Sequence, residues 1–207
     1  MGMGSSKILL GRTLLIVIFV GCALSAALLF YFIPKNSAKS GPTKSNEQEE
    51  LDPSAEATFG LPVRLKIPGI NVDSAVESVG LTPQRTMEMP KDPNNVAWFN
   101  LGTRPGEIGS SVITGHYGIW KNGKGSVFDN LHKLRVGDKL YIEDDTGTII
   151  SFVVLESRSF DPKADASTVF SSDDGKAHLN LITCEGAWNE SKKSYSERLV
   201  VFTDIVD

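Results

Sequence analysis

Three side chains that could act together in thiol chemistry stand at wide spacing in this sequence: His116, Cys184 and Arg198. A cysteine nucleophile needs a partner that exchanges protons with it and a donor that stabilises the oxyanion formed on the substrate. Cys184 ends one apolar run, and Arg198 opens the next, with the polar residues 185–197 expected to form a long hairpin loop between them. Because consecutive strands usually pair, we expect the thiol and the guanidinium to be neighbours.

His116 is the histidine best suited to partner the thiol. It ends the apolar run 112–115 and precedes Tyr117 and a glycine, which would place its ring at the mouth of a barrel. His178 lies on the same predicted strand as Cys184, and six residues at ~3.3 Å each separate the two by roughly 20 Å. His132 is expected on the surface of a short helix. Taken singly, His116 could still be a rim histidine, Cys184 a buried structural thiol and Arg198 an ordinary edge-strand charge.

The elements that must position these residues are short β-strands. Apolar runs separated by Pro, Gly and Asp predict about eight of them, at 63–67, 72–79, 96–99, 111–116, 139–143, 148–155, 178–184 and 198–206. A tight turn is expected at 144–147 and helical turns near 127–134 and 165–170. This pattern predicts a mainly β domain, an eight-stranded closed or nearly closed barrel with one or two short helices.

The N-terminal part of the chain predicts a membrane anchor. Residues 13–33 carry no charge, and as a helix they would span roughly 30 Å, the thickness of the hydrocarbon core of a bilayer. We therefore divide the chain into a flank at 1–12, a single transmembrane helix at 13–33, a flexible tether at 34–59 and a folded domain at 60–207. The basic residues on the two sides of the span nearly balance, but the short flank favours a cytoplasmic N-terminus and an extracellular domain. A lipoprotein-type signal ending at Cys22 is disfavoured, because uncharged residues continue well beyond it.

Composition and charge exclude several classes of protein. The 207 residues carry a net charge of -4, so the composition does not indicate a positively charged surface for binding nucleic acid. Only two cysteines occur, and Cys22 lies in the predicted span, so a disulfide scaffold and a cysteine-rich zinc site are excluded. Asp144 and Asp145 are interpreted as solvated turn carboxylates. We expect neither a metal nor a cofactor.

The motifs around the three candidate residues resemble those of sortases, over about residues 60–207. Thr114-Gly115-His116, Leu181-Ile182-Thr183-Cys184 and Arg198-Leu199-Val200-Val201 occur in the order that the family shows. Leu181 departs from the pattern, which has Thr or another small residue there. The segments 63–68, 89–93, 96–98 and 104–106 look most like class F or class E sortases.

The resemblance implies a membrane-bound bacterial cysteine transpeptidase. Such an enzyme cleaves a Leu-Pro-x-Thr-Gly (LPxTG) sorting signal of a secreted surface protein between Thr and Gly through a thioester, and an amine of a cell-wall peptide then resolves the thioester. The positions that match the family motifs are Cys184 as nucleophile, His116 as acid and base, and Arg198 as oxyanion or substrate clamp. Thr183 would help to line the oxyanion site.

Two other functions compete with this interpretation. A peptidoglycan L,D-transpeptidase also uses Cys and His on a β fold, but its Ser-x-Gly-Cys-x-Arg block is not found here, because Glu185 and Gly186 follow Cys184. Papain-like peptidases place Cys before His in the chain, the reverse of the present order. A non-enzymatic, membrane-tethered β-domain with a buried Cys184 is the remaining alternative.

Overall fold

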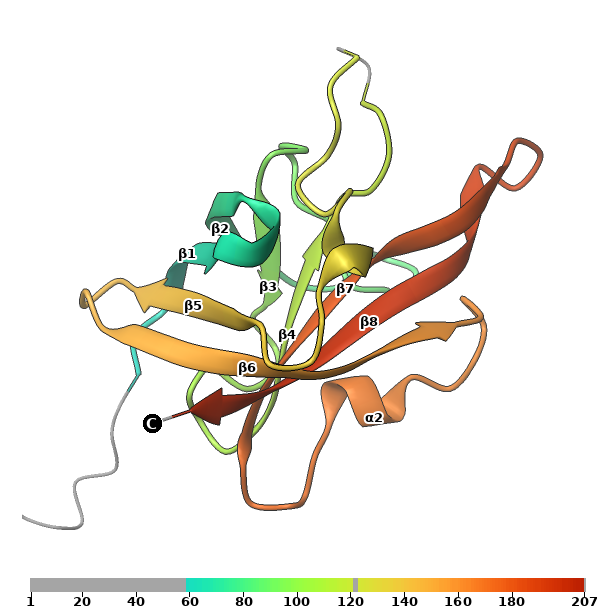
Figure 1. Cartoon of the computed structure of the whole chain (residues 1–207). Coiled ribbons are helices and arrows are strands. Elements are labelled where there is room, and N and C mark those ends of the chain that lie inside the picture. The colour runs from blue at the N-terminus through green and yellow to red at the C-terminus, as the bar shows by residue number, and fades with distance from the viewer. Residues whose placement is uncertain (1–58, 121–122, 207) are drawn as a thin grey trace, which may run out of the picture. The chain divides into compact units, whose positions relative to one another are not determined.

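Eight strands close into a barrel in the order β1-β2-β3-β4-β7-β8-β6-β5, with β5 pairing back onto β1 (Figure 1). The computed structural model describes residues 59–120 and 123–206. The strands are β1 (Pro62–Ile67), β2 (Val72–Val79), β3 (Val96–Phe99), β4 (Gly109–Gly115), β5 (Lys139–Asp144), β6 (Ile149–Phe160), β7 (Ala177–Asn189) and β8 (Ser194–Val206). The helical elements are the 3-10 turns η1 (Pro68–Ile70) and η2 (Leu131–Lys133) and the single turn α2 (Ser167–Phe170). The prediction of a mainly β, eight-stranded barrel is confirmed, as are helical turns within 127–134 and 165–170.

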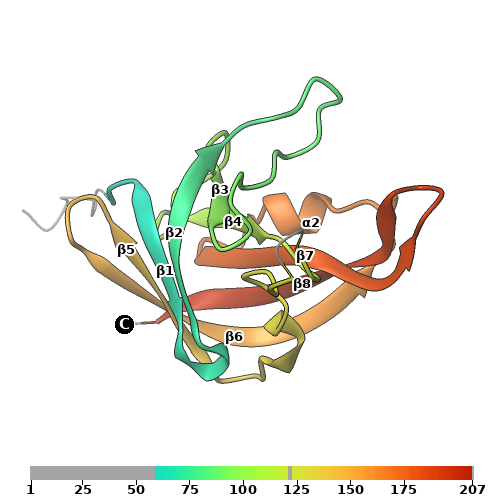
Figure 2. The same ribbon diagram turned by 90° about the horizontal axis from the view of Figure 1, so that it is seen from above.

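The predicted long loop at 185–197 is wrong. Strands β7 and β8 continue past Cys184 and Arg198 and pair as far as Asn189 with Ser194, so the turn is confined to 190–193. Trp188 and Tyr195 are cross-strand partners whose ring centroids lie 5.1 Å apart. Such aromatic pairs stabilise a hairpin although its other side chains are polar. The hairpin extends beyond the barrel (Figure 2).

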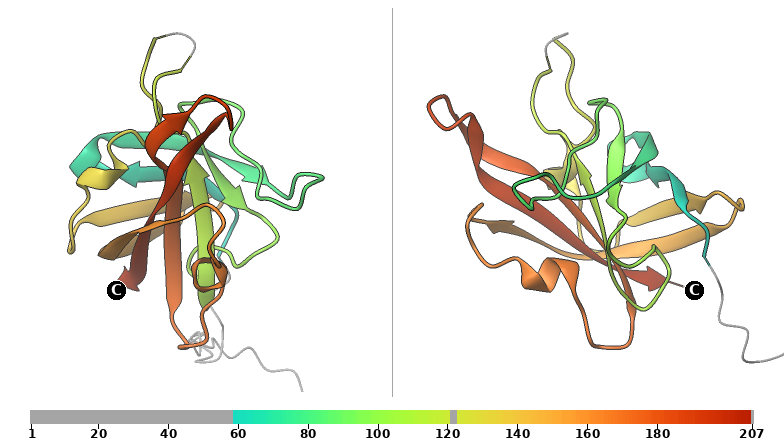
Figure 3. Two further views of the ribbon diagram at one scale, coloured as in Figure 1. Left: turned by 90° about the vertical axis from the view of Figure 1, so that its right-hand side faces the viewer. Right: turned by 180° about the vertical axis from the view of Figure 1, so that it is seen from behind.

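Alternation of side chains along the strands builds two hydrophobic clusters on opposite faces of the barrel wall. Leu179 and Leu181 of β7 point inward and pack with Leu199 and Val201 of β8 in the main core. The alternate side chains point outward, where Val200 of β8 packs with a smaller cluster that includes residues of α2 and β4. This outer cluster holds the segment around α2 against the barrel, and Figure 3 shows α2 beside β4 and β7.

The turn between β5 and β6 lies where it is predicted, but one of its carboxylates is not solvated. Asp144 is 2% exposed and accepts hydrogen bonds from the amides of Gly60, Thr146 and Thr148. Burial alone would raise its pKa, but these bonds and one from the Thr146 hydroxyl together lower the pKa to about 2. The backbone amide of Leu61 donates to Asp145 in the same way. Both carboxylates therefore fasten the entry of β1 to this turn.

The predicted N-terminal flank, transmembrane helix and nearly all of the tether lie outside the described residues. Within residues 59–120 and 123–206, no helix is long and apolar enough to cross a bilayer. The same residues contain no group of three or more His, Cys, Asp and Glu side chains placed to hold a metal ion.

Candidate active site

Strand register brings His116, Cys184 and Arg198 together. Cys184 on β7 is the direct cross-strand partner of Arg198 on β8, as expected from the pairing of consecutive strands. On the other side of β7, the parallel partner β4 aligns Thr114 with Ile182. His116 directly follows the last residue of β4, and extending this register by two residues places it beside Cys184; both residues and Arg198 line one groove. The three side chains therefore form a row across β4, β7 and β8 with the thiol in the middle.

All three side chains belong to the outer face of the barrel wall. Ile182, two residues before Cys184, and Val200, two residues after Arg198, both pack in the outer cluster. Since side chains alternate along a strand, Cys184 and Arg198 face the same way. Val112 of β4, four residues before His116, also packs in the outer cluster, so the same alternation directs the His116 side chain to this face.

A buried hydrogen bond fixes the spacing between the histidine and cysteine strands. The Thr183 hydroxyl donates to the carbonyl of Gly115 over 2.8 Å, and Thr183 is 2% exposed. These two residues directly precede Cys184 and His116. A Cβ at Gly115 would lie 2.5 Å from the ring of Phe128, so glycine is required for β4 to pass this close to the core.

His116 is held by a backbone carbonyl and an aromatic ring. Its Nε2 lies 2.8 Å from the carbonyl oxygen of Pro90. A carbonyl can only accept, so Nε2 carries a hydrogen and Nδ1 is the nitrogen left to exchange protons with another group. The Trp120 ring packs against the imidazole with centroids 4.8 Å apart. The ring is therefore oriented before any substrate binds.

Cys184 is a free, half-buried thiol. Burial raises its pKa, and the charge of Arg198 opposes that shift without cancelling it. The thiolate is the nucleophilic form, so the free protein holds this sulfur mainly as the neutral thiol at pH 7.

The Arg198 guanidinium is anchored by main-chain oxygens. Its Nη1 donates to the carbonyls of Glu197, at 2.9 Å, and Tyr195, at 3.3 Å. Within the described part of the chain it forms no salt bridge with a carboxylate. Its positive charge therefore remains available to an oxygen of a bound substrate.

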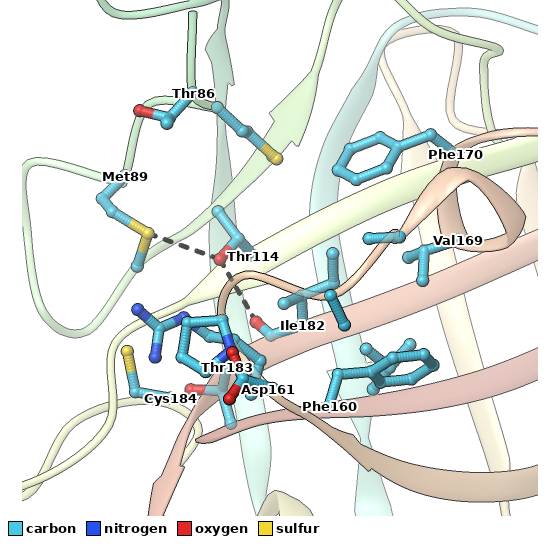
Figure 4. A pocket seen from close by; sticks show the side chains of 16 residues that line it. Thr86, Met89, Thr114, Phe160, Asp161, Val169, Phe170, Ile182, Thr183 and Cys184 are labelled. Carbon is cyan, nitrogen blue, oxygen red and sulfur yellow. Dashed lines mark hydrogen bonds between the residues drawn. The ribbon is translucent and has the colours of Figure 1, made fainter. Parts of the chain in front are cut away.

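Cys184 and Arg198 separate two hollows in the surface. The first is a cavity of about 270 Å³ between the outer face of β7 and the segment around α2. Figure 4 shows its apolar lining by Met89, Phe160, Val169, Phe170 and Ile182, with Cys184 and Thr183 at one end. The second is a wider groove of about 880 Å³ on the side of His116 and the β7–β8 hairpin. A peptide bound across the Cys184 thiol would therefore contact the apolar cavity on one side and the polar, aromatic groove on the other.

The other two histidines lie away from this row. His132 is exposed on η2, as predicted. His178 lies six residues before Cys184 on β7, and its Nδ1 and Nε2 are bonded to Asp204, at 2.6 Å, and Asp174, at 2.9 Å. Burial lowers the pKa of His178, but the hydrogen bonds and charges of the two carboxylates outweigh burial and raise the pKa overall.

Several residues at the site were not singled out from the sequence. Pro90 and Met89 reach the site from the long connection between β2 and β3; the segment 89–93 resembles the family in sequence, but no role at the site is predicted for these two residues. Asp129 and Tyr195 line the groove beside Cys184 from other loops and strands. Tyr195 lies within the segment 185–197 that is predicted to be a loop, so the sequence gives no reason to place it at the site.

Comparisons with known proteins agree with this geometry. A family model described as "Sortase domain" matches residues 65–206. Sortase C-1 from Actinomyces oris has 25% sequence identity and a TM-score of 0.55, over 70% of this chain and 75% of that chain. Sortase C1 of Streptococcus agalactiae, in its complex with MTSET, has 26% identity and a TM-score of 0.54, over 70% of this chain and 69% of that chain.

Sortase A from Corynebacterium diphtheriae shares the fold at 23% identity, with a TM-score of 0.55 over 73% of this chain and 63% of that chain. A search of curated proteins found no match.

Proposed function

Because the chain belongs to the sortase family of cysteine transpeptidases, we propose that it cleaves an LPxTG-type sorting signal between Thr and Gly and transfers the surface protein to a cell-wall amine. The observation that carries the proposal is the row of His116, Cys184 and Arg198 set by the registers of β4, β7 and β8. A proton carrier, a nucleophile and a cation then share one scissile carbonyl, as thioester chemistry requires.

In the first half-reaction, the Cys184 sulfur attacks the threonine carbonyl carbon. The proton of the thiol passes to Nδ1 of His116, the nitrogen not bonded to Pro90. Arg198 stabilises the oxyanion, and Thr183 supports the site by holding β7 against β4. When the C–N bond breaks, His116 gives the proton to the departing glycine nitrogen, leaving a thioester on Cys184.

In the second half-reaction, an amine attacks the thioester carbon and the C–S bond breaks. His116 takes a proton from the attacking nitrogen, and the Cys184 sulfur leaves as thiolate and is reprotonated. A thioester retains much of the free energy of the cleaved amide, so amide formation needs no further energy source. The raised pKa of Cys184 keeps the reactive thiolate scarce at neutral pH, which supports slow turnover.

The cavity beside α2 suits the apolar part of the sorting signal. Met89, Val169 and Phe170 provide a lining that would bury a leucine and a proline next to Cys184. Burial of apolar surface stabilises such a complex by about 25 cal/mol per Å². The sequence motifs favour class F or class E within the family.

We also propose that residues 13–33 anchor the enzyme in the bacterial membrane as a single pass, with the N-terminus in the cytoplasm and the catalytic domain outside. The support is the uncharged run, long enough to span a bilayer. The expected result is a chain that remains in the membrane fraction after alkaline extraction and whose domain is digested by protease added to cells with the wall removed. A chain released by alkaline treatment would contradict the anchor.

The family match favours this activity over the two alternatives. A peptidoglycan L,D-transpeptidase or a non-enzymatic tethered domain would not require a sortase domain over residues 65–206.

The decisive experiment incubates the purified full chain with a fluorescence-quenched LPxTG peptide and an amine. We expect cleavage between Thr and Gly, a product joined to the amine, and a covalent thioester detected by mass spectrometry. Cys184→Ala should abolish both cleavage and thioester. Cleavage that persists in Cys184→Ala, or no cleavage of any sorting-signal variant by the wild type, would contradict the proposed function.

A further inference from the structure

Glu77, a half-buried residue of β2, binds the connection that brings Pro90 to the site. Its carboxylate accepts hydrogen bonds from the amide of Lys91 at 3.0 Å, the amide of Asp92 at 3.4 Å and the side-chain amide of Asn95 at 3.0 Å. Three donors from one irregular segment therefore converge on one carboxylate. These bonds, the one from Lys91 first, lower the pKa of Glu77 against the effect of burial, so the carboxylate is ionised at neutral pH.

Strand pairing places Glu77 on the same face of the barrel wall as the candidate catalytic residues. Glu77 is the parallel partner of Ala97 on β3, and Ala97 is the antiparallel partner of Thr114 on β4. Cross-strand partners point to the same face of a sheet, and Thr114 lies two residues before His116, so these side chains share the outer face. The connection bonds to Glu77 and, through the sulfur of Met89, to the Thr114 hydroxyl (Figure 4), so it crosses the outer face over β3.

The peptide group between Pro90 and Lys91 is bonded on both of its sides. Its carbonyl oxygen lies 2.8 Å from Nε2 of His116, and its N–H donates to Glu77. The peptide bond is trans, so the C=O and the N–H point in opposite directions from a rigid plane. Pro90 itself is buried. One planar unit held against the barrel wall therefore lies between the Glu77 carboxylate and the His116 ring.

We propose that Glu77 is a positioning residue for the transpeptidation, acting on His116 through the Pro90–Lys91 peptide group. The inference rests on the proposed function and adds a residue that its reaction steps do not include. A carboxylate that accepts from a peptide N–H fixes the plane of that peptide and polarises its carbonyl, which makes the carbonyl a stronger acceptor. The hydrogen of the imidazole is thereby held at Nε2, and Nδ1 is left for proton transfer with Cys184.

This arrangement resembles a catalytic triad with a peptide group inserted into it. In a triad the carboxylate bonds directly to the imidazole and holds it in one tautomer and one orientation. Here the carboxylate of Glu77 lies one peptide group further away, and the Pro90 carbonyl makes the direct contact with the ring. The effect on the ring is therefore transmitted by a fixed dipole instead of a neighbouring charge.

Other contacts hold the part of the connection that lies closer to β3. The amide of Val127 donates to the Pro93 carbonyl, and the Ser74 hydroxyl donates to the Asn94 carbonyl. These bonds keep the segment folded when Glu77 is replaced. The Lys91 amide has a single hydrogen, which Glu77 accepts, so loss of the carboxylate releases the N–H side of the peptide group.

The kinetic test compares three variants of the full chain in cleavage of the quenched LPxTG peptide. We expect Glu77→Ala to lower kcat about tenfold or more, because the imidazole is no longer held in place. KM should change less than about twofold, since Glu77 does not line the cavity beside α2. Glu77→Gln keeps an oxygen for the Lys91 amide and should lose less than about threefold in kcat. Glu88→Ala removes a carboxylate from the same connection, one that accepts from the Gly80 amide at 3.3 Å, and should retain the wild-type kcat.

NMR of the chain with isotope-labelled histidine reads the position of the proton without turnover. The nitrogen shifts of a neutral imidazole differ between the Nε2–H and Nδ1–H tautomers, and the signal missing from His116→Gln identifies the ring. We expect the Nε2–H tautomer in the wild type and in Glu77→Gln, and a mixture of the two tautomers in Glu77→Ala. The urea midpoint of each variant, measured alongside, reports whether the domain remains folded.

Three results would overturn the inference. They are a wild-type kcat in Glu77→Ala, an unchanged tautomer of His116 in that folded variant, and a loss of rate in Glu88→Ala as large as that in Glu77→Ala. Absence of cleavage by the wild type would instead count against the proposed function, while the tautomer measurement would still test the link from Glu77 to His116.

Discussion

The hydrogen bond from Thr183 to Gly115 gives the sharpest test of how the site is held. It is a buried side-chain bond at the end of the β4–β7 ladder, next to Cys184 and His116, and it spans 68 residues of sequence. Thr183→Val has nearly the same shape as threonine but cannot donate. Thr183→Ser keeps the hydroxyl and loses one methyl group. The pair of variants therefore separates the hydrogen bond from the packing.

The expected magnitudes follow from the burial of Thr183, which is 2% exposed. Losing a buried hydrogen bond and leaving the Gly115 carbonyl without this donor costs about 1–3 kcal/mol in the Val variant. Losing one buried methyl group costs about 0.8 kcal/mol in the Ser variant. For a domain of this size, each kcal/mol corresponds to a shift in Tm of about 2–4 °C.

Urea denaturation, thermal melting and peptide cleavage would be measured on the same three proteins. We expect Thr183→Val to be the less stable variant and to lose at least about tenfold in kcat/KM, because a displacement of ~1 Å at a catalytic group can cost ~100-fold. Thr183→Ser should remain close to the wild type in rate. A valine variant as active as the serine variant would refute the idea that this bond sets the distance between thiol and imidazole.

Gly115→Ala should lower the free energy of unfolding by about 1–3 kcal/mol and reduce cleavage, because the added Cβ would lie 2.5 Å from the Phe128 ring; unchanged urea midpoints would contradict this. Asp144→Asn should cost about 1–2 kcal/mol at pH 7. The folded pKa of Asp144 is about 2 and its ordinary value 3.8, so its contribution is present above pH 3.8 and lost as the pH falls toward 2, and the mutant and wild type should converge in acid. His178 has a raised folded pKa, so its contribution is full below its ordinary value of 6.5 and lost as the pH rises through the folded value. His178→Gln should remove that part of the pH dependence of Tm, and an unaltered profile would contradict it.

The sequence by itself determined the local elements and the pairing of Cys184 with Arg198. Period-two alternation and turn residues act within a few positions, so all eight strands could be predicted, most within two residues at their starts. A hairpin also pairs consecutive strands, which brings the thiol beside the guanidinium whatever the rest of the fold does. The polar residues 185–197 were misjudged as a loop because cross-strand aromatic pairing, here Trp188 with Tyr195, is invisible in the composition.

Only the tertiary structure decided where His116 stands and which surface the site uses. The parallel pairing of β4 with β7 joins strands far apart in sequence, and no local pattern specifies that register. The same is true of Pro90 and Asp129, which reach the site from irregular connections. Local propensity acts over a few residues, whereas barrel closure selects one register among many by burying Leu181, Leu199 and their neighbours together. Because of this register, His116, Cys184 and Arg198, which are far apart in the sequence, lie in one row on the outer face of the barrel wall.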